Sequence, residues 1–234
     1  MTLLLLSNSS SDAGFLTHAS GWIADTLGDA TRIVFVPFAD ATGSYDGYTA
    51  RVAEALGSLD VEVTGIHAAS DPLLAVSEAD AVLVGGGNTF KLVHECAERL
   101  LLSAIWHRVS QGAPYVGWSA GANLACPTIR TTNDMPIVEP ASLDALGLVP
   151  VQINPHYTDA HPPGHRGETR ADRLREFVIA NPGIPVVGLP EGTGVRVRGT
   201  DAEILGAGDI RLFDDASPAG RVVTPTDAAA LFAG

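Results

Sequence analysis

The sequence contains little cysteine and little positive charge. Its two cysteines, Cys96 and Cys126, form neither a CxxC motif nor the framework of a disulfide-stapled domain. The 14 Lys and Arg residues stand against 27 Asp and Glu residues, which gives a formal net charge of −13 at pH 7. Because phosphate backbones and anionic membrane surfaces attract basic proteins, we expect neither nucleic acid nor a membrane as a partner.

Long apolar runs are also missing. No stretch approaches the roughly 20 consecutive apolar residues that a membrane-spanning helix needs. The apolar stretch at residues 3–6 is too short for a signal peptide, and no Lys or Arg precedes it. We therefore expect a soluble, cytoplasmic protein.

The apolar content is nevertheless high enough for a sizeable core. Hydrophobic residues make up 46% of the 234 positions and charged residues 18%, a balance that excludes wholesale disorder. At about 150 residues per domain, an α/β fold can hold a chain of this length in one unit. Residues 1–234 are therefore predicted to form a single domain.

Short apolar runs alternate with longer amphipathic segments. Runs typical of strands buried on both faces span residues 3–6, 32–37, 61–66, 81–84, 114–117, 151–154 and 185–189. Apolar residues recur at helical spacing in residues 15–27, 48–59, 89–111 and 168–180. This alternation predicts an α/β fold, a mostly parallel sheet with helices on both faces. Short segments separated by Gly and Asp after residue 192 predict a C-terminal antiparallel β extension.

In such sheets the functional residues lie in loops after the carboxyl ends of the strands. That rule selects residues 7–11, 38–47, 85–88, 118–123 and 155–165. One of these places carries the sequence GWSAG, which matches the G-x-S-x-G motif of a nucleophilic serine. A predicted strand precedes the motif and a predicted helix follows it, as the sharp turn of such a motif requires.

Ser119 is the candidate nucleophile of this turn. The turn would expose its hydroxyl and direct the Ala120 N–H toward an oxyanion beside it. The amides of Gly86 and Gly87 are further candidates for the oxyanion hole, because glycine lets a backbone approach a substrate closely. A tight turn or a phosphate-binding nest is the alternative interpretation of these glycines.

Three histidines, His156, His161 and His165, share one of the selected loops. His156 is nearest to the strand end, where a side chain is held most firmly, so it is the candidate general base for Ser119. The three histidines with Asp159 could instead bind a metal, but their spacing fits no common metal motif. We therefore expect no metal and no other cofactor.

Two carboxylates, Asp134 and Glu191, could orient the imidazole of His156. Asp134 follows Ser119 too closely for the later strand that bears the acid in α/β-hydrolases, which disfavours that fold. Glu191 follows the last predicted core strand, which is a favourable position. The order of the residues does not choose between the two.

With these residues identified, the sequence resembles the peptidase E, or aspartyl dipeptidase, family of serine peptidases. The similar stretches are LLSNS at 5–9, VGGGNTF at 84–90, GWSAGAN at 117–123, INPHY at 153–157 and GHRGETR at 164–170. They occur in order along the whole chain. The resemblance implies a flavodoxin-like three-layer sandwich related to class I glutamine amidotransferases, with serine replacing their cysteine.

The resemblance also implies an activity. It predicts hydrolysis of peptides with an N-terminal aspartate, chiefly dipeptides, without a metal. Ser119 would be the nucleophile, His156 the base, and Asp134 or Glu191 the acid. We expect Glu191 to be the one in contact with His156.

An aspartate side chain needs local positive charge in a protein this acidic. Arg170 and Arg173, at the start of the last predicted helix, can supply it through bidentate hydrogen bonds. We expect these arginines and Asn88 to contact the substrate. The alternative is ordinary surface pairing of the arginines with Glu168 or Asp172.

Other functions stay open. A cyanophycinase-like hydrolase of β-linked aspartyl-arginine would use a similar serine turn, and a non-catalytic module could keep an aspartate-binding pocket. An amidotransferase is disfavoured because Ser119 stands where its cysteine would be. Monomer and homodimer are both compatible with the sequence.

Overall fold

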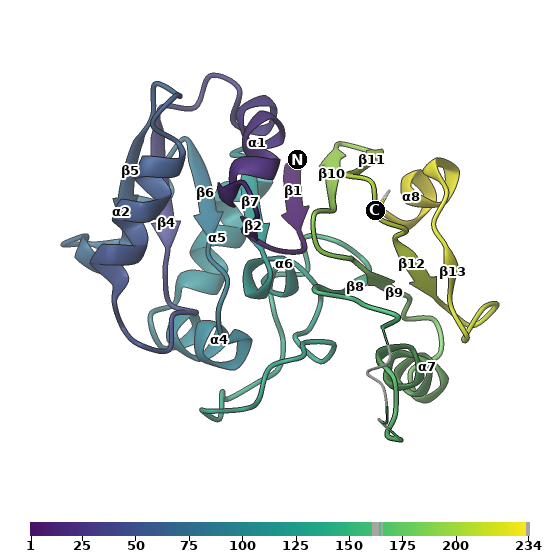
Figure 1. The fold of residues 1–234 in the computed structure, drawn as a ribbon. Coiled ribbons are helices and arrows are strands. Elements are labelled where there is room, and N and C mark those ends of the chain that lie inside the picture. The colour runs from purple at the N-terminus through teal and green to yellow at the C-terminus, as the bar shows by residue number, and fades with distance from the viewer. Residues whose placement is uncertain (161–163, 165, 233–234) are drawn as a thin grey trace.

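A computed structural model describes residues 1–160, 164 and 166–232, and its centre is a seven-stranded sheet (Figure 1). The strands of this sheet are β1 (Thr2–Leu6), β4 (Arg32–Val36), β5 (Glu62–Gly65), β6 (Ala81–Val84), β7 (Tyr115–Trp118), β10 (Gly194–Arg198) and β11 (Asp201–Leu205). Their spatial order is β11-β10-β1-β7-β6-β4-β5. Strands β1, β7, β6, β4 and β5 are parallel, whereas β10 is antiparallel to β1 and to β11.

Helices cover both faces of this sheet. They are α1 (Ser20–Leu27), α2 (Tyr45–Ala55), α3 (Pro72–Glu78), α4 (Thr89–Glu98), α5 (Leu101–Ser110) and α6 (Ala120–Leu124). Alternate residues of β1 point to opposite faces: Leu4 and Leu6 pack with α1 and α2, while Leu3 and Leu5 pack with the core under α3 to α6. All four leucines are fully buried, which explains the continuous apolar run in the sequence.

A second sheet lies beside the first (Figure 1). Its strands are β8 (Gln152–Asn154), β9 (Val186–Gly188), β12 (Arg211–Phe213) and β13 (Arg221–Val222), in the order β13-β12-β9-β8. Helix α7 (Arg170–Ala180) packs its Leu174 and Val178 against this sheet, and α8 (Pro225–Phe232) packs against β11. The short elements are β2 (Ser10–Ser11), β3 (Gly14–Phe15) and the 3₁₀ turns η1 (Thr17–Ala19) and η2 (Ile66–Ala68).

The predicted α/β class, with a mostly parallel sheet and an antiparallel C-terminal extension, is confirmed. Several boundaries differ. The helix predicted at 89–111 is two helices, because Leu100 adopts a left-handed conformation with φ 58° between them. The helix predicted at 15–27 begins only at Ser20, after the left-handed Leu16, and the one predicted at 48–59 spans Tyr45–Ala55.

The strands expected to complete the main sheet, β8 and β9, belong to the second sheet instead. Hydrophobic periodicity indicates that a strand is buried but not which strand it pairs with. The membership of β8 and β9 in a second sheet could therefore not be predicted from the sequence pattern. Helices α3 and α8 were not predicted. Among the residues that the structure describes, no helix has the length and hydropathy needed to cross a membrane.

The turn from β7 into α6 depends on close backbone contact. Ser119 at this turn has φ 53° and ψ −112°. Gly121, two residues later, lies so close to β6 that a Cβ atom there would come within 2.2 Å of the carbonyl oxygen of Val84. The helix can therefore approach the sheet this closely only with glycine at that position.

We expect Gly121→Ala to lower the free energy of unfolding by about 1–3 kcal/mol, because the backbone of α6 or β6 must shift. The control is Gly21→Ala in α1, where no atom lies within 4 Å of an added Cβ. That change should raise the free energy of unfolding by up to about 1 kcal/mol, since alanine favours a helix over glycine. Urea unfolding of both variants tests the pair, and equal shifts would contradict the packing argument.

Candidate active site

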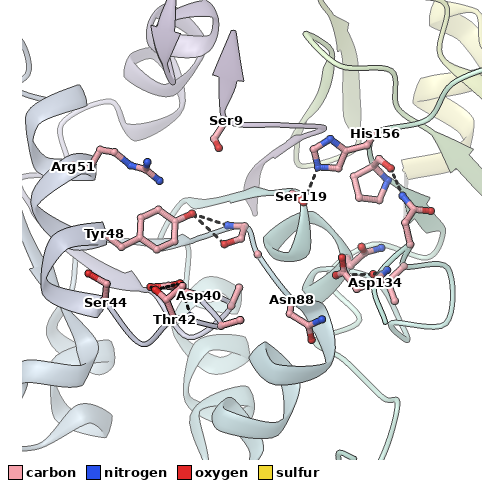
Figure 2. A pocket seen from close by; sticks show the side chains of 18 of the residues that line it. Ser9, Asp40, Thr42, Ser44, Tyr48, Arg51, Asn88, Ser119, Asp134 and His156 are labelled. Atoms are coloured by element: carbon pink, nitrogen blue, oxygen red, sulfur yellow. Dashed lines mark hydrogen bonds between the residues drawn. The ribbon is translucent and has the colours of Figure 1, made fainter. Parts of the chain in front are cut away.

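Three side chains from separate parts of the chain form a continuous hydrogen-bonded row, and Figure 2 shows its Ser119–His156 contact. The Oγ of Ser119 and the Nε2 of His156 are 2.9 Å apart, and the Nδ1 of His156 is 2.8 Å from Oε1 of Glu191. A carboxylate can only accept, so Nδ1 carries the proton and Nε2 is free to accept the serine proton. Each residue follows a strand end, of β7, β8 and β9 respectively.

This row is open to solvent on the acid side. The side chain of His156 is 40% exposed and that of Glu191 is 66% exposed. Water screens the attraction between an imidazolium and a carboxylate at such a site. The contact therefore serves mainly to fix the orientation and tautomer of the imidazole, and contributes less charge stabilisation than a buried acid would.

The backbone of His156 is held in a conformation that few non-glycine residues adopt, with φ 53°. Its N–H donates to the Oγ of Ser7 at 2.9 Å, and that hydroxyl donates in turn to the carbonyl of Leu189 at 2.8 Å. Ser7 is fully buried and directly follows β1. Ser7 thus connects the backbone of His156, which follows a strand of the second sheet, to the carboxyl end of β1 in the central sheet.

The second predicted acid, Asp134, lies elsewhere in the site. Its Oδ2 accepts hydrogen bonds from the N–H and Oγ1 of Thr89, at 2.8 and 2.6 Å, and from Oγ1 of Thr132 at 3.0 Å. Thr89 begins α4, so the carboxylate also faces the positive end of that helix. Of the two candidate acids, the structure brings Glu191 and not Asp134 to His156.

The three amides predicted for the oxyanion hole are not equivalent. The Gly86 N–H already donates to the hydroxyl of Tyr48 at 2.9 Å. Among the described residues, no acceptor takes the N–H of Gly87 or of Ala120. A side chain at Gly87, where φ is 137°, would meet the carbonyl oxygen of Ala39 at 2.2 Å. Two amides, those of Gly87 and Ala120, are therefore available to an oxyanion beside Ser119.

Tyr48, which was not predicted from the sequence, holds the glycine loop at residues 85–87 through hydrogen bonds to Gly86. Its hydroxyl accepts from the Gly86 N–H and from Nε1 of Trp118, each at 2.9 Å, and donates to the Gly86 carbonyl at 3.2 Å. Burial raises the pKa of Tyr48, so the hydroxyl stays protonated and can make all three contacts. Tyr48 therefore fixes the peptide that precedes Gly87.

These groups border one cavity of about 800 Å³. Of the predicted site residues, Ser119, His156, Gly86, Gly87, Asn88 and Asp134 line it. The side chain of Asn88 caps α4 by accepting from the Lys91 N–H at 3.0 Å, and donates to the carbonyl of Met135 at 2.8 Å. Both polar atoms of the Asn88 side chain are thus already hydrogen-bonded to the backbone of other residues.

The two predicted arginines lie outside this cavity lining. In the described part of the chain, neither Arg170 nor Arg173 is among the lining residues. Arg170 donates to Oδ1 of Asn154 at 3.4 Å. Burial, and secondly the positive charge of Arg173, lower the pKa of Arg170. Arg173 is exposed and lies 3.8 Å from Glu168, as in the surface pairing weighed above. Among the described residues that line the cavity, the Lys or Arg side chain is that of Arg51.

Sequence signals for the missed residues were present but weak. Ser7 belongs to the selected loop 7–11, Tyr48 directly follows the selected loop 38–47, and Arg51 comes three residues after Tyr48. In a single sequence, however, these two residues look like ordinary members of an amphipathic helix. His161 and His165, weighed as metal ligands, lie outside the residues that the structure describes.

We expect Tyr48→Phe to lower the free energy of unfolding by about 1–3 kcal/mol, because buried donors on Gly86 and Trp118 lose their acceptor. The matched control is Tyr45→Phe on the same helix, whose hydroxyl contacts the Nζ of Lys91 while that ammonium keeps other partners. Its cost should stay below about 1 kcal/mol. Urea unfolding measures both, and equal losses would show that the backbone contacts of Tyr48 carry no special weight.

Comparison with known proteins places the chain in a family. The family model described as peptidase family S51 matches residues 3–205. Proteins named peptidase E from Citrobacter koseri and from Escherichia coli O6:K15:H31 are each 50% identical over 233 residues, covering 99% of this chain and all of theirs. A peptidase E from Salmonella newport is 52% identical over 214 residues, which cover 91% of this chain and 93% of its own.

Two crystal structures share the fold. One, from Listeria monocytogenes EGD-e and provisionally named peptidase E, has a TM-score of 0.66 at 22% identity and covers 88% of this chain and 98% of its own. The other, a peptidase from an acI-B1 Actinobacterium, has a TM-score of 0.62 at 14% identity, covering 95% and 96% respectively. The family resemblance inferred from the motifs is confirmed by the sequence relatives. The chain belongs to peptidase family S51.

Proposed function

We propose that this member of family S51 is a serine dipeptidase that hydrolyses the bond after an N-terminal aspartate. The observation that carries the proposal is the hydrogen-bonded row of Ser119, His156 and Glu191, of which Ser119 and His156 line the cavity. Relatives named peptidase E, at 50% identity over nearly the whole chain, support the same reaction class. The substrate is accordingly a short peptide.

In the proposed reaction, Ser119 Oγ attacks the aspartyl carbonyl carbon while Nε2 of His156 takes the serine proton. The resulting oxyanion accepts hydrogen bonds from the amides of Gly87 and Ala120. His156 then passes the proton to the leaving amine as the C–N bond breaks. A water molecule, deprotonated by the same imidazole, hydrolyses the aspartyl ester and restores the serine.

Arg170 is the proposed partner of the substrate's aspartate side chain. Among the described residues, no carboxylate lies within ion-pair distance of its guanidinium, and its contact with Asn154 is with a neutral amide. Asn154 ends β8, two residues before His156, so Arg170 lies on the histidine side of the nucleophile. Arg173 adds positive charge nearby, while its exposure and its pairing with Glu168 reduce its contribution.

We also propose that the enzyme works in the cytoplasm. Cys96 and Cys126 are both free and fully buried, as is usual where thiols are kept reduced.

We expect Ser119→Ala to lower kcat for Asp-Leu by about 10⁴-fold or more, since the acyl-enzyme can no longer form. Ser103→Ala, at an exposed position of α5, is the control and should leave kcat unchanged. The measurement is leucine release by purified protein, with Glu-Leu, Asn-Leu and β-Asp-Arg as comparison substrates. Wild-type turnover by Ser119→Ala would refute the mechanism, and faster release from β-Asp-Arg would favour a cyanophycinase-like activity.

The roles of the two acids can be separated with isosteric amides. Glu191→Gln should lower kcat by about 10²-fold, less than for a buried acid, because its charge is already screened. Asp134→Asn should change kcat by less than about tenfold while lowering the free energy of unfolding by about 1 kcal/mol, because Thr89 and Thr132 lose a charged acceptor. Kinetics with Asp-Leu and urea unfolding test both. A larger kcat loss in Asp134→Asn at unchanged stability would reverse the assignment.

A further inference from the structure

The cavity extends well beyond the residues that carry out the proposed reaction. At its other end, across from Ser119 and His156, stands Arg51 of α2 (Figure 2). Its Cζ lies 4.3 Å from the ring centroid of Phe15 and 5.3 Å from that of Tyr48. Two aromatic rings thus hold the flat guanidinium in place while its N–H edges remain available for hydrogen bonds.

This arginine has no carboxylate partner of its own. Among the described residues, no Asp or Glu oxygen lies within ion-pair distance of its guanidinium, although the protein has a net charge of −13. The cavity's own carboxylates are engaged elsewhere: Asp40 accepts from the N–H and Oγ1 of Thr42, and Asp134 from Thr89. Within the described lining, Arg51 is the one Lys or Arg side chain.

The position of Arg51 determines which part of a peptide it can meet. The acyl part must lie against Ser119 and the amides of Gly87 and Ala120, and its side chain is assigned to Arg170 on the histidine side. The remaining space runs past Gly86 and Tyr48 toward Arg51. That space is left for the portion of the peptide beyond the cleaved bond.

We propose that Arg51 binds the free C-terminal carboxylate of the peptide, on the leaving side of the cleaved bond. This inference rests on the proposed function, because it assumes peptide hydrolysis at Ser119. A guanidinium with open edges matches a carboxylate through two parallel hydrogen bonds. Since every unmodified peptide ends in this group, Arg51 recognises short substrates whatever residue follows the aspartate.

The test compares substrates that differ only in this carboxylate. In each pair, a peptide with a free C-terminal carboxylate is compared with the same peptide as its C-terminal amide. The two peptides are Asp-Leu and Asp-Ala-Leu. Asp-p-nitroanilide is a further substrate, whose leaving group has no carboxylate. For at least one pair, wild-type kcat/KM should be about 10- to 100-fold higher for the acid than for the amide, the range of a charged hydrogen bond. The pair with the larger ratio identifies the peptide length that reaches Arg51.

In Arg51→Met, which keeps an apolar stem against Phe15 and Tyr48, the acid-to-amide ratio should fall to near one, mainly through a higher KM. Turnover of Asp-p-nitroanilide should change by less than about twofold, because its leaving group carries no negative charge and its nitro oxygens accept hydrogen bonds only weakly. Arg51→Lys keeps the charge without the fork and should give an intermediate ratio. The control is Arg130→Met, which should leave the acid-to-amide ratio at its wild-type value. The Cζ of Arg130 also lies over an aromatic ring, 5.1 Å from the centroid of Phe177, but Arg130 is outside the cavity lining.

An acid-to-amide ratio that survives in Arg51→Met overturns the inference. So does an equal fall in Asp-p-nitroanilide and Asp-Leu turnover, which would place Arg51 at the aspartyl group or in the scaffold. A wild-type ratio near one for both pairs also overturns it while leaving the proposed function intact. Failure of the wild-type protein to cleave any of the aspartyl substrates would instead refute the proposed function, and the inference with it.

Discussion

The site depends on one strained residue between a strand and a helix. Ser119 has a positive φ, which costs a residue with a side chain about 1–3 kcal/mol. The conformation persists because its backbone groups are all engaged: the N–H donates to the carbonyl of Leu6, and the carbonyl accepts from Ala122 and Asn123. Glycine at position 121 then brings α6 against β6. This geometry leaves the hydroxyl and the Ala120 amide pointing into the same space.

A second strained residue, His156, faces the first from another sheet. Neither conformation is favourable locally, and each is stabilised by hydrogen bonds to the carboxyl end of β1, through Leu6 for the serine and through Ser7 for the histidine. The 2.9 Å contact between them thus reflects how two sheets are joined at one strand end. Glu191 adds orientation from the exposed side, where its charge is screened.

The sequence was sufficient for the class of fold and for the pairing of Ser119 with His156, because both depend on local patterns: buried strands, turn residues and the rule that strand ends converge. The same patterns left Asp134 and Glu191 both open as the acid, and the expectation that Glu191 contacts His156 came with the family resemblance. The engagement of Gly86 by Tyr48, the packing of Arg51 on Phe15 and the hydrogen bonds from Thr89 to Asp134 were not predictable in this way. Each joins residues far apart in the chain, and each residue is of a type that occurs at many surface or helix positions. The assignment of β9 to the second sheet was missed for the same reason.

The position of β1 has a consequence for biosynthesis. This first strand is paired on one side with β7 and on the other with β10, which is made much later, and the Ser7 that follows it binds the backbone of His156 and Leu189. A nascent chain on the ribosome therefore lacks an assembled site until β10 has emerged. A hydrolase built this way cannot act on other peptides while it is still being translated.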